Sequence, residues 1–176
     1  GQINLSRIWN PKTAKENFSQ VKKEYNRSEY GPIADSKIKA IEGYSESLNS
    51  LKIYESVSLD TMVVDTALND SIKKKNPKPS KTYEELLYHL GDLEAFSFDR
   101  LDTGIVFFKK ILSNDSTSKF YPKALFTLSL IYSDIGDTIE SSKYKNILQS
   151  KFPKSDYTSY IFKEDNFNNE KRPIEL

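Results

Sequence analysis

The side chains that could perform chemistry are few in this sequence, and they form no recognisable catalytic or metal-binding pattern. His89 is the only histidine, and the chain has no cysteine. There is therefore no pair of histidines for a helical zinc motif, and no thiolate for metal binding, disulfide formation or nucleophilic attack. We interpret His89, which lies between Tyr88 and Leu90, as a structural or surface residue, with contact to a partner as the alternative.

The acidic residues near the expected turns are interpreted as helix caps and solvated charges. Asp134, Asp137 and Glu140 surround one turn, but their spacing is not that of an EF-hand calcium loop. A second acidic group comprises Asp92, Glu94, Asp99 and Asp102. No nucleophile elbow, P-loop or dinucleotide-binding glycine motif occurs, and six glycines leave little material for a phosphate-binding loop. We therefore predict no catalytic residue, no cofactor and no bound metal, and we do not expect an enzyme.

The composition favours an elongated helical protein and excludes two classes of partner. Hydrophobic residues make up 37% and charged residues 29% of the 176 positions, a balance typical of helical repeats that pack only on their neighbours. The net charge of +1 argues against a general nucleic-acid-binding protein. The 11 tyrosines and 10 phenylalanines are interpreted as packing residues, because basic residues are not interleaved with them on one face. No stretch approaches ~20 apolar residues, so we predict no membrane span.

The N-terminal part of the sequence, residues 1–54, predicts a pair of helices. Asn10 followed by Pro11 is a favourable helix start, because Asn caps and Pro fits the first turn. Apolar side chains then recur on one helical face at Ala14, Phe18, Val21 and Tyr25. The pattern breaks at residues 26–31, and Pro32 starts a second apolar stripe that extends to about Tyr54. The short break predicts that the two helices are antiparallel.

Residues 55–81 are predicted to be an irregular segment that ends in a linker. Residues 55–72 mix β-branched side chains with helix-favouring ones, so we assign them no conformation. The linker, Lys73–Lys81, contains five lysines, two prolines and no apolar residue. This composition indicates a solvated loop, with contact to phosphate or to an acidic partner as the alternative.

Residues 82–164 predict a series of helices with clear ends. Thr82 and Glu85 have the spacing of a capping box. Gly136 ends the third helix of this series and Asp137 caps the fourth. Ser155 is expected to cap a last short helix, and residues 165–176 are predicted to be a flexible tail.

The sequence also repeats itself. Leu148–Tyr157 is a near copy of Val21–Tyr30, and each copy predicts the end of one helix, a turn and the start of the next. Within the C-terminal part, Leu112 and Leu148 are 36 residues apart, as are Tyr121 and Tyr157. This period lies in the range of two-helix solenoid repeats.

At these positions the sequence resembles the tetratricopeptide repeat (TPR) family. The residues that carry the resemblance are the pairs Leu90-Gly91 and Leu128-Ser129, Tyr132, the turn Gly136-Asp137, the aromatic residues Phe108 and Tyr144, and Pro153. The family would have Ala at the positions of Gly104 and of Ser141 or Ser142, and an aromatic residue near Glu94. The resemblance implies an all-α fold of helical-hairpin repeats, stacked in a short right-handed TPR-like superhelix.

Within that family, the turn Phe152–Tyr157 and the long period resemble the periplasmic TPR proteins of bacterial envelopes, both BamD-like assembly lipoproteins and YbgF-like Tol-Pal accessory proteins. The run from Glu85 to Leu112 also resembles the C-terminal region of large envelope proteins in the Bacteroidota. The resemblance implies a non-catalytic scaffold in cell-envelope or outer-membrane assembly, located in the periplasm, with the cytoplasm as the alternative. The chain lacks a starting Met, and a targeting signal or lipid anchor could precede Gly1.

The resemblance also implies where a partner would bind, because the first helix of each TPR unit lines a concave groove. Aligning Leu90-Gly91 with Leu128-Ser129 predicts the groove positions Glu85, Tyr88, Asp92 and Phe96 in one unit and Lys123, Phe126, Leu130 and Asp134 in the next. This mixture of aromatic and charged side chains suits a peptide or helix of a partner protein better than a small molecule. An oligomer-building module and a fragment of a larger envelope protein are alternative functions. A helical enzyme or metal-binding protein is the one that the residues favour least.

Overall fold

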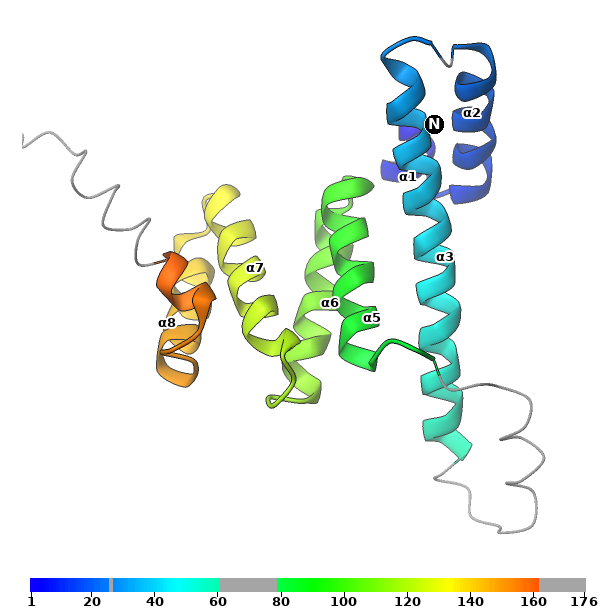
Figure 1. Cartoon of the computed structure of the whole chain (residues 1–176). Helices are drawn as coiled ribbons and strands as arrows, with labels where there is room; N and C mark the ends of the chain where they lie inside the picture. Colours follow the sequence, from blue (N-terminus) through cyan, green and yellow to red (C-terminus); the bar gives the residue numbers. More distant parts are fainter. Residues whose placement is uncertain (26, 61–78, 162–176) are drawn as a thin grey trace, which may run out of the picture. The chain divides into compact units, whose positions relative to one another are not determined.

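The computed structural model describes residues 1–25, 27–60 and 79–161, and all regular secondary structure in these ranges is helical (Figure 1). The elements are α1 (Gln2–Ser6), α2 (Pro11–Glu24), α3 (Tyr30–Asp60), α5 (Tyr83–Asp92), the π-helical segment η1 (Leu93–Ser97), α6 (Leu101–Asn114), α7 (Phe120–Asp134) and α8 (Thr138–Lys151). Residues 156–161 are also helical. The prediction of an all-α fold is therefore confirmed for the described part of the chain.

The chain divides into two compact units, residues 1–107 and residues 108–176. The division falls within α6, and it does not coincide with the predicted division between residues 81 and 82. The physical reason is that α3 packs against both α5 and η1. The N-terminal helix pair and the first helix after the predicted linker therefore belong to one unit. Each unit is described by itself below.

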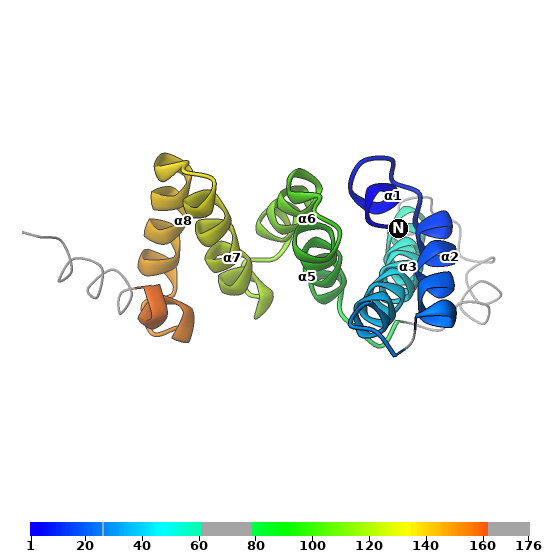
Figure 2. The same cartoon turned by 90° about the horizontal axis from the view of Figure 1, so that it is seen from above.

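In the first unit, α2 and α3 lie side by side as an antiparallel pair, as predicted (Figures 1 and 2). The side chain of Asn10 caps α2 by accepting the backbone N–H of Thr13 at 3.1 Å, and Pro11 occupies the first helical position. The hydrophobic core of this pair includes Ala14 and Ile41. Local start signals in the sequence therefore act as expected at this helix.

The helix α3 is longer than predicted, since it continues past Tyr54 to Asp60. Residues 55–60, the beginning of the predicted irregular segment, are thus helical. At its far end α3 meets the start of α5, where the Tyr54 hydroxyl donates a hydrogen bond to the Lys81 carbonyl at 2.8 Å. The rest of the predicted irregular segment, residues 61–78, lies outside the described residues, as do residues 162–164 and the predicted tail.

A π-helical segment, η1, ends the helix that begins with α5. The backbone N–H of Phe98 bonds to the carbonyl of Leu93, five residues earlier, at 2.9 Å. This wider turn accommodates one residue more than an α-helix would. After the turn the chain reverses, and Gly104 of α6 lies directly against α5 and η1. A Cβ atom at Gly104 would be 2.9 Å from the carbonyl oxygen of Gly91 and 2.7 Å from the Cβ of Ala95. The small residues at these positions thus allow the two backbones to approach closely.

In the second unit, α7 and α8 form a helical hairpin (Figures 1 and 2). Asp137 caps α8 by accepting the N–H of Glu140 at 3.0 Å, as predicted. A serine lies at the close contact of this hairpin, where the Ser141 hydroxyl donates a buried hydrogen bond to the Ser129 carbonyl at 2.8 Å. Ser141 stands where the TPR family has Ala, and this bond compensates for the burial of its hydroxyl group.

The two turns, one between η1 and α6 and one between α7 and α8, have the same backbone geometry. Each contains one residue in the left-handed region, Asp99 at φ 58° and Gly136 at φ 82°. The bonds that close the turns are Arg100 N–H to Glu94 O and Asp137 N–H to Tyr132 O, both at 2.8 Å. Equivalent turn residues are 37 positions apart, one more than the predicted period of 36. The first helices are offset by 38, because η1 holds an extra residue.

A second kind of turn, which we name the serine turn after its capping residue, occurs three times. At Ser28 the backbone N–H bonds to the carbonyl of Tyr25 at 3.0 Å, and the side-chain Oγ accepts the N–H of Tyr30 at 3.3 Å. The predicted copy repeats both distances, with Ser155 N–H to Phe152 O at 3.0 Å and Tyr157 N–H to Ser155 Oγ at 3.3 Å. The two segments that resemble each other in sequence therefore make the same local structure.

The third serine turn, at Ser118, lies in a stretch that the sequence indicates only as a polar loop. Ser118 donates its N–H to the carbonyl of Asp115 at 3.4 Å, and its Oγ accepts the N–H of Phe120 at 3.2 Å. Asp115 stands where the other two copies have an aromatic residue, which is why the sequence alone does not reveal this copy. Ser118 and Ser155 are 37 residues apart, the same spacing as the left-handed turn residues.

Candidate functional site

The groove positions predicted in the first unit lie on one side of α5 and η1. Glu85, Tyr88 and Asp92 are half-buried, and Phe96 is 57% exposed. An exposed phenylalanine at the end of a row of partly accessible polar and aromatic residues is compatible with a contact surface. The structure thus leaves all four side chains at least partly accessible to a partner.

The groove positions predicted in the second unit show the same order of burial along α7. Lys123, Phe126 and Leu130 are half-buried, and Asp134 is exposed. Phe126 is already occupied in part, since its ring lies 5.3 Å from that of Tyr157 and 5.7 Å from that of Tyr160. The matching order of burial supports the register that aligns the two first helices. The two sets of four residues belong to different units, so the structure describes each half of the predicted groove separately.

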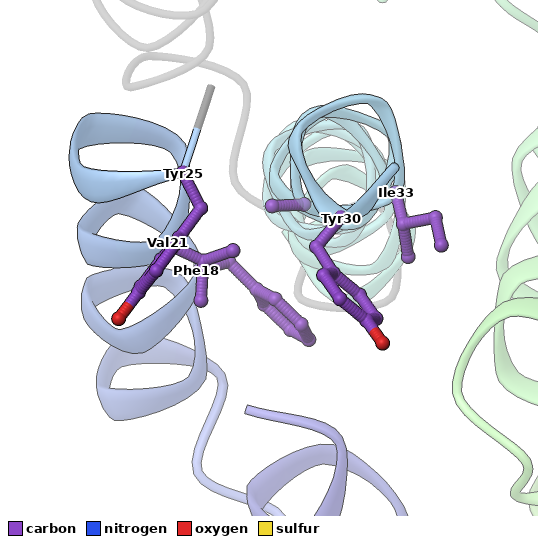
Figure 3. Close-up of a pocket in the computed structure, with 6 residues that line it drawn as sticks. Phe18, Val21, Tyr25, Tyr30 and Ile33 are labelled. Carbon is purple, nitrogen blue, oxygen red and sulfur yellow. The ribbon is translucent and has the colours of Figure 1, made fainter. Parts of the chain in front are cut away.

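An apolar pocket of about 390 Å³ lies between α2 and α3 near the serine turn at Ser28 (Figure 3). Its lining contains only apolar and aromatic side chains, namely Phe18, Val21, Tyr25, Tyr30, Ile33 and Ala34. Tyr25 is 58% exposed and Tyr30 is 59% exposed. Figure 3 shows the rings of Phe18 and Tyr30 facing one another across the gap between the two helices. We name this feature the α2–α3 pocket.

Charged residues beside the α2–α3 pocket are paired with each other. Lys22 of α2 lies 2.6 Å from Asp35 of α3, and Lys15 lies 2.8 Å from Glu42. The hydrogen bond from Lys22 lowers the pKa of Asp35 below its ordinary value. These pairs bridge α2 and α3 and leave the pocket lining without a formal charge. The sequence analysis placed Phe18, Val21 and Tyr25 on the buried face of a helix pair, and it therefore did not identify this pocket.

His89 lines a second, more polar cavity of about 250 Å³ between α3 and α5. Its Nδ1 atom is 3.0 Å from the hydroxyl of Ser47, which is 3% exposed. Burial lowers the pKa of His89, and the positive charge of Lys81 adds to this effect, while Asp92 and Glu85 oppose it. Because the Ser47 hydroxyl is inaccessible, the pair is not arranged as a nucleophile and base for an external substrate. The structure places His89 in a contact between helices.

A buried charge cluster lies at the π-helical segment. Glu94 is fully buried, and its Oε1 atom accepts a hydrogen bond from the Tyr44 hydroxyl at 2.8 Å. Burial raises the pKa of Glu94, whereas the Tyr44 hydrogen bond and the Arg100 charge oppose the rise. Arg100 lies 3.3 Å from the other carboxylate oxygen, but that oxygen and Arg100 Nη1 have no hydrogen-bond partner among the described residues. The carboxylate is thus compensated by one hydrogen bond and one ion pair.

The same cluster holds the N-terminal segment in place. The guanidinium of Arg100 lies 3.7 Å above the centre of the Trp9 ring. The Trp9 ring also contacts those of Tyr44 at 5.2 Å and Phe98 at 5.6 Å. Trp9 has a φ of 53°, a conformation that L-residues adopt only when their surroundings require it. Because every polar group in the cluster has a structural contact, we interpret the cluster as a fixing point for the N-terminal segment.

Two searches of the described ranges concern metals and membranes. In residues 1–25, 27–60 and 79–161, no group of three or more histidine, aspartate or glutamate side chains is placed to hold a metal ion. No helix of this part of the chain combines the length and the apolar content needed to cross a membrane. Comparison with known proteins found no matching family model, no matching curated protein and no matching solved structure.

Proposed function

We propose that this protein is a non-catalytic helical repeat scaffold of the TPR-like kind, and that it binds a protein or peptide partner. The observation that carries the proposal is the recurrence of two turn geometries, the serine turn at Ser28, Ser118 and Ser155 and the left-handed turn at Asp99 and Gly136. Repeated supersecondary units that stack on each other build extended surfaces, and such surfaces commonly bind extended partners.

Within this proposal, the partner lies along the first helices of the two hairpins. The equal burial of the paired positions Glu85 and Lys123, and of Asp92 and Leu130, supports the register on which this surface rests. The surface carries both charges and aromatic rings, which suits the polar rim and apolar centre of a protein contact. The proposed location is the bacterial periplasm, in association with the outer membrane. Its support is the resemblance of the turn Phe152–Tyr157 to envelope TPR proteins.

A photo-crosslinking experiment in cells tests this surface. A photoreactive amino acid would be placed at Phe96 or Leu130, and at Val106 or Ile139 as matched controls on the second helices. Val106 and Ile139 are exposed apolar residues. We expect a discrete adduct with one protein from the first-helix positions and none from the controls. The same adducts from both sets, or adducts from neither set, would contradict the proposed surface.

A further inference from the structure

Two serine turns with the same backbone geometry differ in how far their side chains are covered. In the copy at Ser155, Leu148 is 0% exposed, and Phe152 and Tyr157 are half-buried. The equivalent residues at Ser28 are Val21, which is half-buried, and Tyr25 and Tyr30, which are more than half exposed. The residue types are alike at all three positions, so the difference must come from what packs against them.

In the covered copy, the packing comes from the preceding helix. Tyr121 of α7 lies 5.7 Å from the ring of Phe152, and Phe126 of α7 lies 5.3 Å from the ring of Tyr157. Two aromatic side chains five residues apart on one helix thus cover the two aromatic residues of the serine turn. Aromatic pairs at such centroid distances stabilise a contact beyond the area that they bury.

In the uncovered copy, the preceding helix is too short to reach the turn. This helix is α1, which has five residues and packs on α2 with Leu5 fully buried. A Cβ atom on Gly1 would lie 2.6 Å from the ring of Phe18, which lines the α2–α3 pocket. The surface that α1 covers on α2 therefore ends at the edge of this pocket. The α2–α3 pocket continues an interface that already exists within the chain.

We infer that the α2–α3 pocket is the docking site for an amphipathic helix of a partner protein, with two aromatic side chains placed as Tyr121 and Phe126 are on α7. This helix would lie against Tyr25 and Tyr30 as α7 lies against Phe152 and Tyr157. The inference rests on the proposed scaffold function insofar as the occupant is a protein, but it concerns a different surface from the first-helix groove.

The chemistry of the pocket favours a helix face over other ligands. Its lining offers no formal charge, so it lacks the groups that would orient a charged metabolite. The exposed tyrosine rings, with their hydroxyl groups, suit a ligand that is apolar on one side and solvated on the other. An amphipathic helix has both sides, and it needs no unpaired backbone group from the groove.

A peptide with the sequence of residues 118–134 is a direct probe, because it contains α7 and its two aromatic residues. The labelled peptide would be titrated with the full chain, and binding would be followed by fluorescence anisotropy. We expect saturable binding to the wild-type chain and at least ~10-fold weaker binding to Ile33→Lys, which places a charge in the pocket lining. Ile139→Lys is the matched control, since Ile139 is 80% exposed on α8, and it should bind like the wild type.

A second peptide separates specific docking from exchange with the α7 helix of the chain itself. A peptide with alanine in place of both Tyr121 and Phe126 should bind at least ~10-fold more weakly to the wild-type chain. Equal binding of the original peptide to the wild type and to Ile33→Lys would overturn the proposal. Circular dichroism should show unchanged helicity for Ile33→Lys, because Ile33 is an exposed residue.

The remaining outcome concerns a second copy of this chain as the occupant. If light scattering finds a wild-type dimer that Ile33→Lys converts to a monomer, the pocket is an interface between copies and the partner proposal is overturned. The peptide titration and the crosslinking at Phe96 and Leu130 report on separate surfaces. Crosslinks without peptide binding would therefore remove this inference alone, and peptide binding without crosslinks would remove the proposed groove alone.

Discussion

At the scale of single residues, the least expected feature is a buried carboxylate in a helix where an aromatic residue was predicted. Glu94 occupies this position and is compensated by Tyr44 and Arg100. Burying a charge is costly unless hydrogen bonds and ion pairs offset the lost hydration. Burial and the hydrogen bond to Glu94 also raise the pKa of Tyr44, so Tyr44 keeps its proton and remains a donor at all physiological pH values.

The Tyr44 hydroxyl should therefore contribute measurably to stability. Replacing Tyr44 with Phe removes the hydrogen bond to Glu94 and leaves a buried acceptor unsatisfied, so we expect the free energy of unfolding to fall by about 1–3 kcal/mol. Urea unfolding measures this change. The matched control is Tyr25→Phe, which removes a hydroxyl from an exposed side chain and should change stability by less than ~0.5 kcal/mol. Equal effects of the two substitutions would contradict the role assigned to the Glu94 cluster.

His89 should make stability depend on pH in one direction. Its pKa in the folded chain lies below the ordinary value of 6.5, so the unfolded chain binds a proton more readily than the folded one. The free energy of unfolding should therefore decrease as the pH falls from about 6.5 toward the folded pKa, and His89 should contribute no such change above that window. Unfolding of the wild type and of His89→Gln at pH 7.5 and pH 5.5 checks this. The wild type should lose more stability than the variant between these two pH values.

At the scale of elements, close helix contacts rest on small residues. Gly104 faces the carbonyl oxygen of Gly91 and the side chain of Ala95 with no room for a Cβ atom. Gly43, in the middle of α3, faces the ring of His89, and a Cβ atom there would be at an ordinary contact distance of 3.4 Å. The same substitution at these two glycines should therefore have opposite consequences.

Gly104→Ala should destabilise the protein by about 1–3 kcal/mol, because the added methyl group must displace backbone atoms. Gly43→Ala should be neutral or stabilise it by up to about 1 kcal/mol, since Ala favours the helix and the site has space. Thermal unfolding followed by circular dichroism compares the two variants. A stabilising effect of Gly104→Ala would show that α5 and α6 are not as closely packed as described.

The serine turns also allow a prediction at the scale of elements. Ser118→Ala and Ser155→Ala each remove a side-chain cap from the first turn of a helix. Each should lower the free energy of unfolding by about 1 kcal/mol, and Thr should retain part of the effect of Ser. Ser142 is exposed within α8, so Ser142→Ala serves as the control and should have little effect. Loss of stability in the control alone would argue against the capping role.

At the scale of the whole molecule, the nearly balanced charge makes association weakly dependent on salt. The 26 basic and 25 acidic residues leave a net charge of +1, so long-range steering of a partner should be small. For the α2–α3 pocket, whose lining has no formal charge, we expect peptide affinity to change by less than ~3-fold between 50 mM and 500 mM salt. A steep loss of affinity with salt would indicate that surface charges rather than the pocket carry the interaction.

Features that depend on neighbouring residues could be predicted from the sequence. The caps at Asn10, Thr82 and Asp137 are examples, since each satisfies a backbone group three residues away and requires no knowledge of the fold. The joining turns at Ser28 and Ser155 were recognised for the same reason. Helices and turns were therefore largely predictable.

Features that depend on distant residues could not be predicted. The π-helical segment surrounds Glu94, whose partner Tyr44 lies 50 residues away on another helix. The α2–α3 pocket depends on what does not cover Tyr25, and an apolar stripe indicates a face without indicating its neighbour. For the predicted groove, the sequence provides a register with matched burial, while the binding function itself stays a prediction.

The position of Trp9 has a practical consequence for spectroscopy. It is the only tryptophan of the chain, and it lies between Arg100 and the rings of Tyr44 and Phe98. Intrinsic fluorescence excited at the indole therefore reports on one event, the release of the first nine residues from η1. Far-ultraviolet circular dichroism reports instead on the helices as a whole. A fluorescence transition that precedes the loss of ellipticity on heating would measure how firmly the N-terminal segment is attached, without any label.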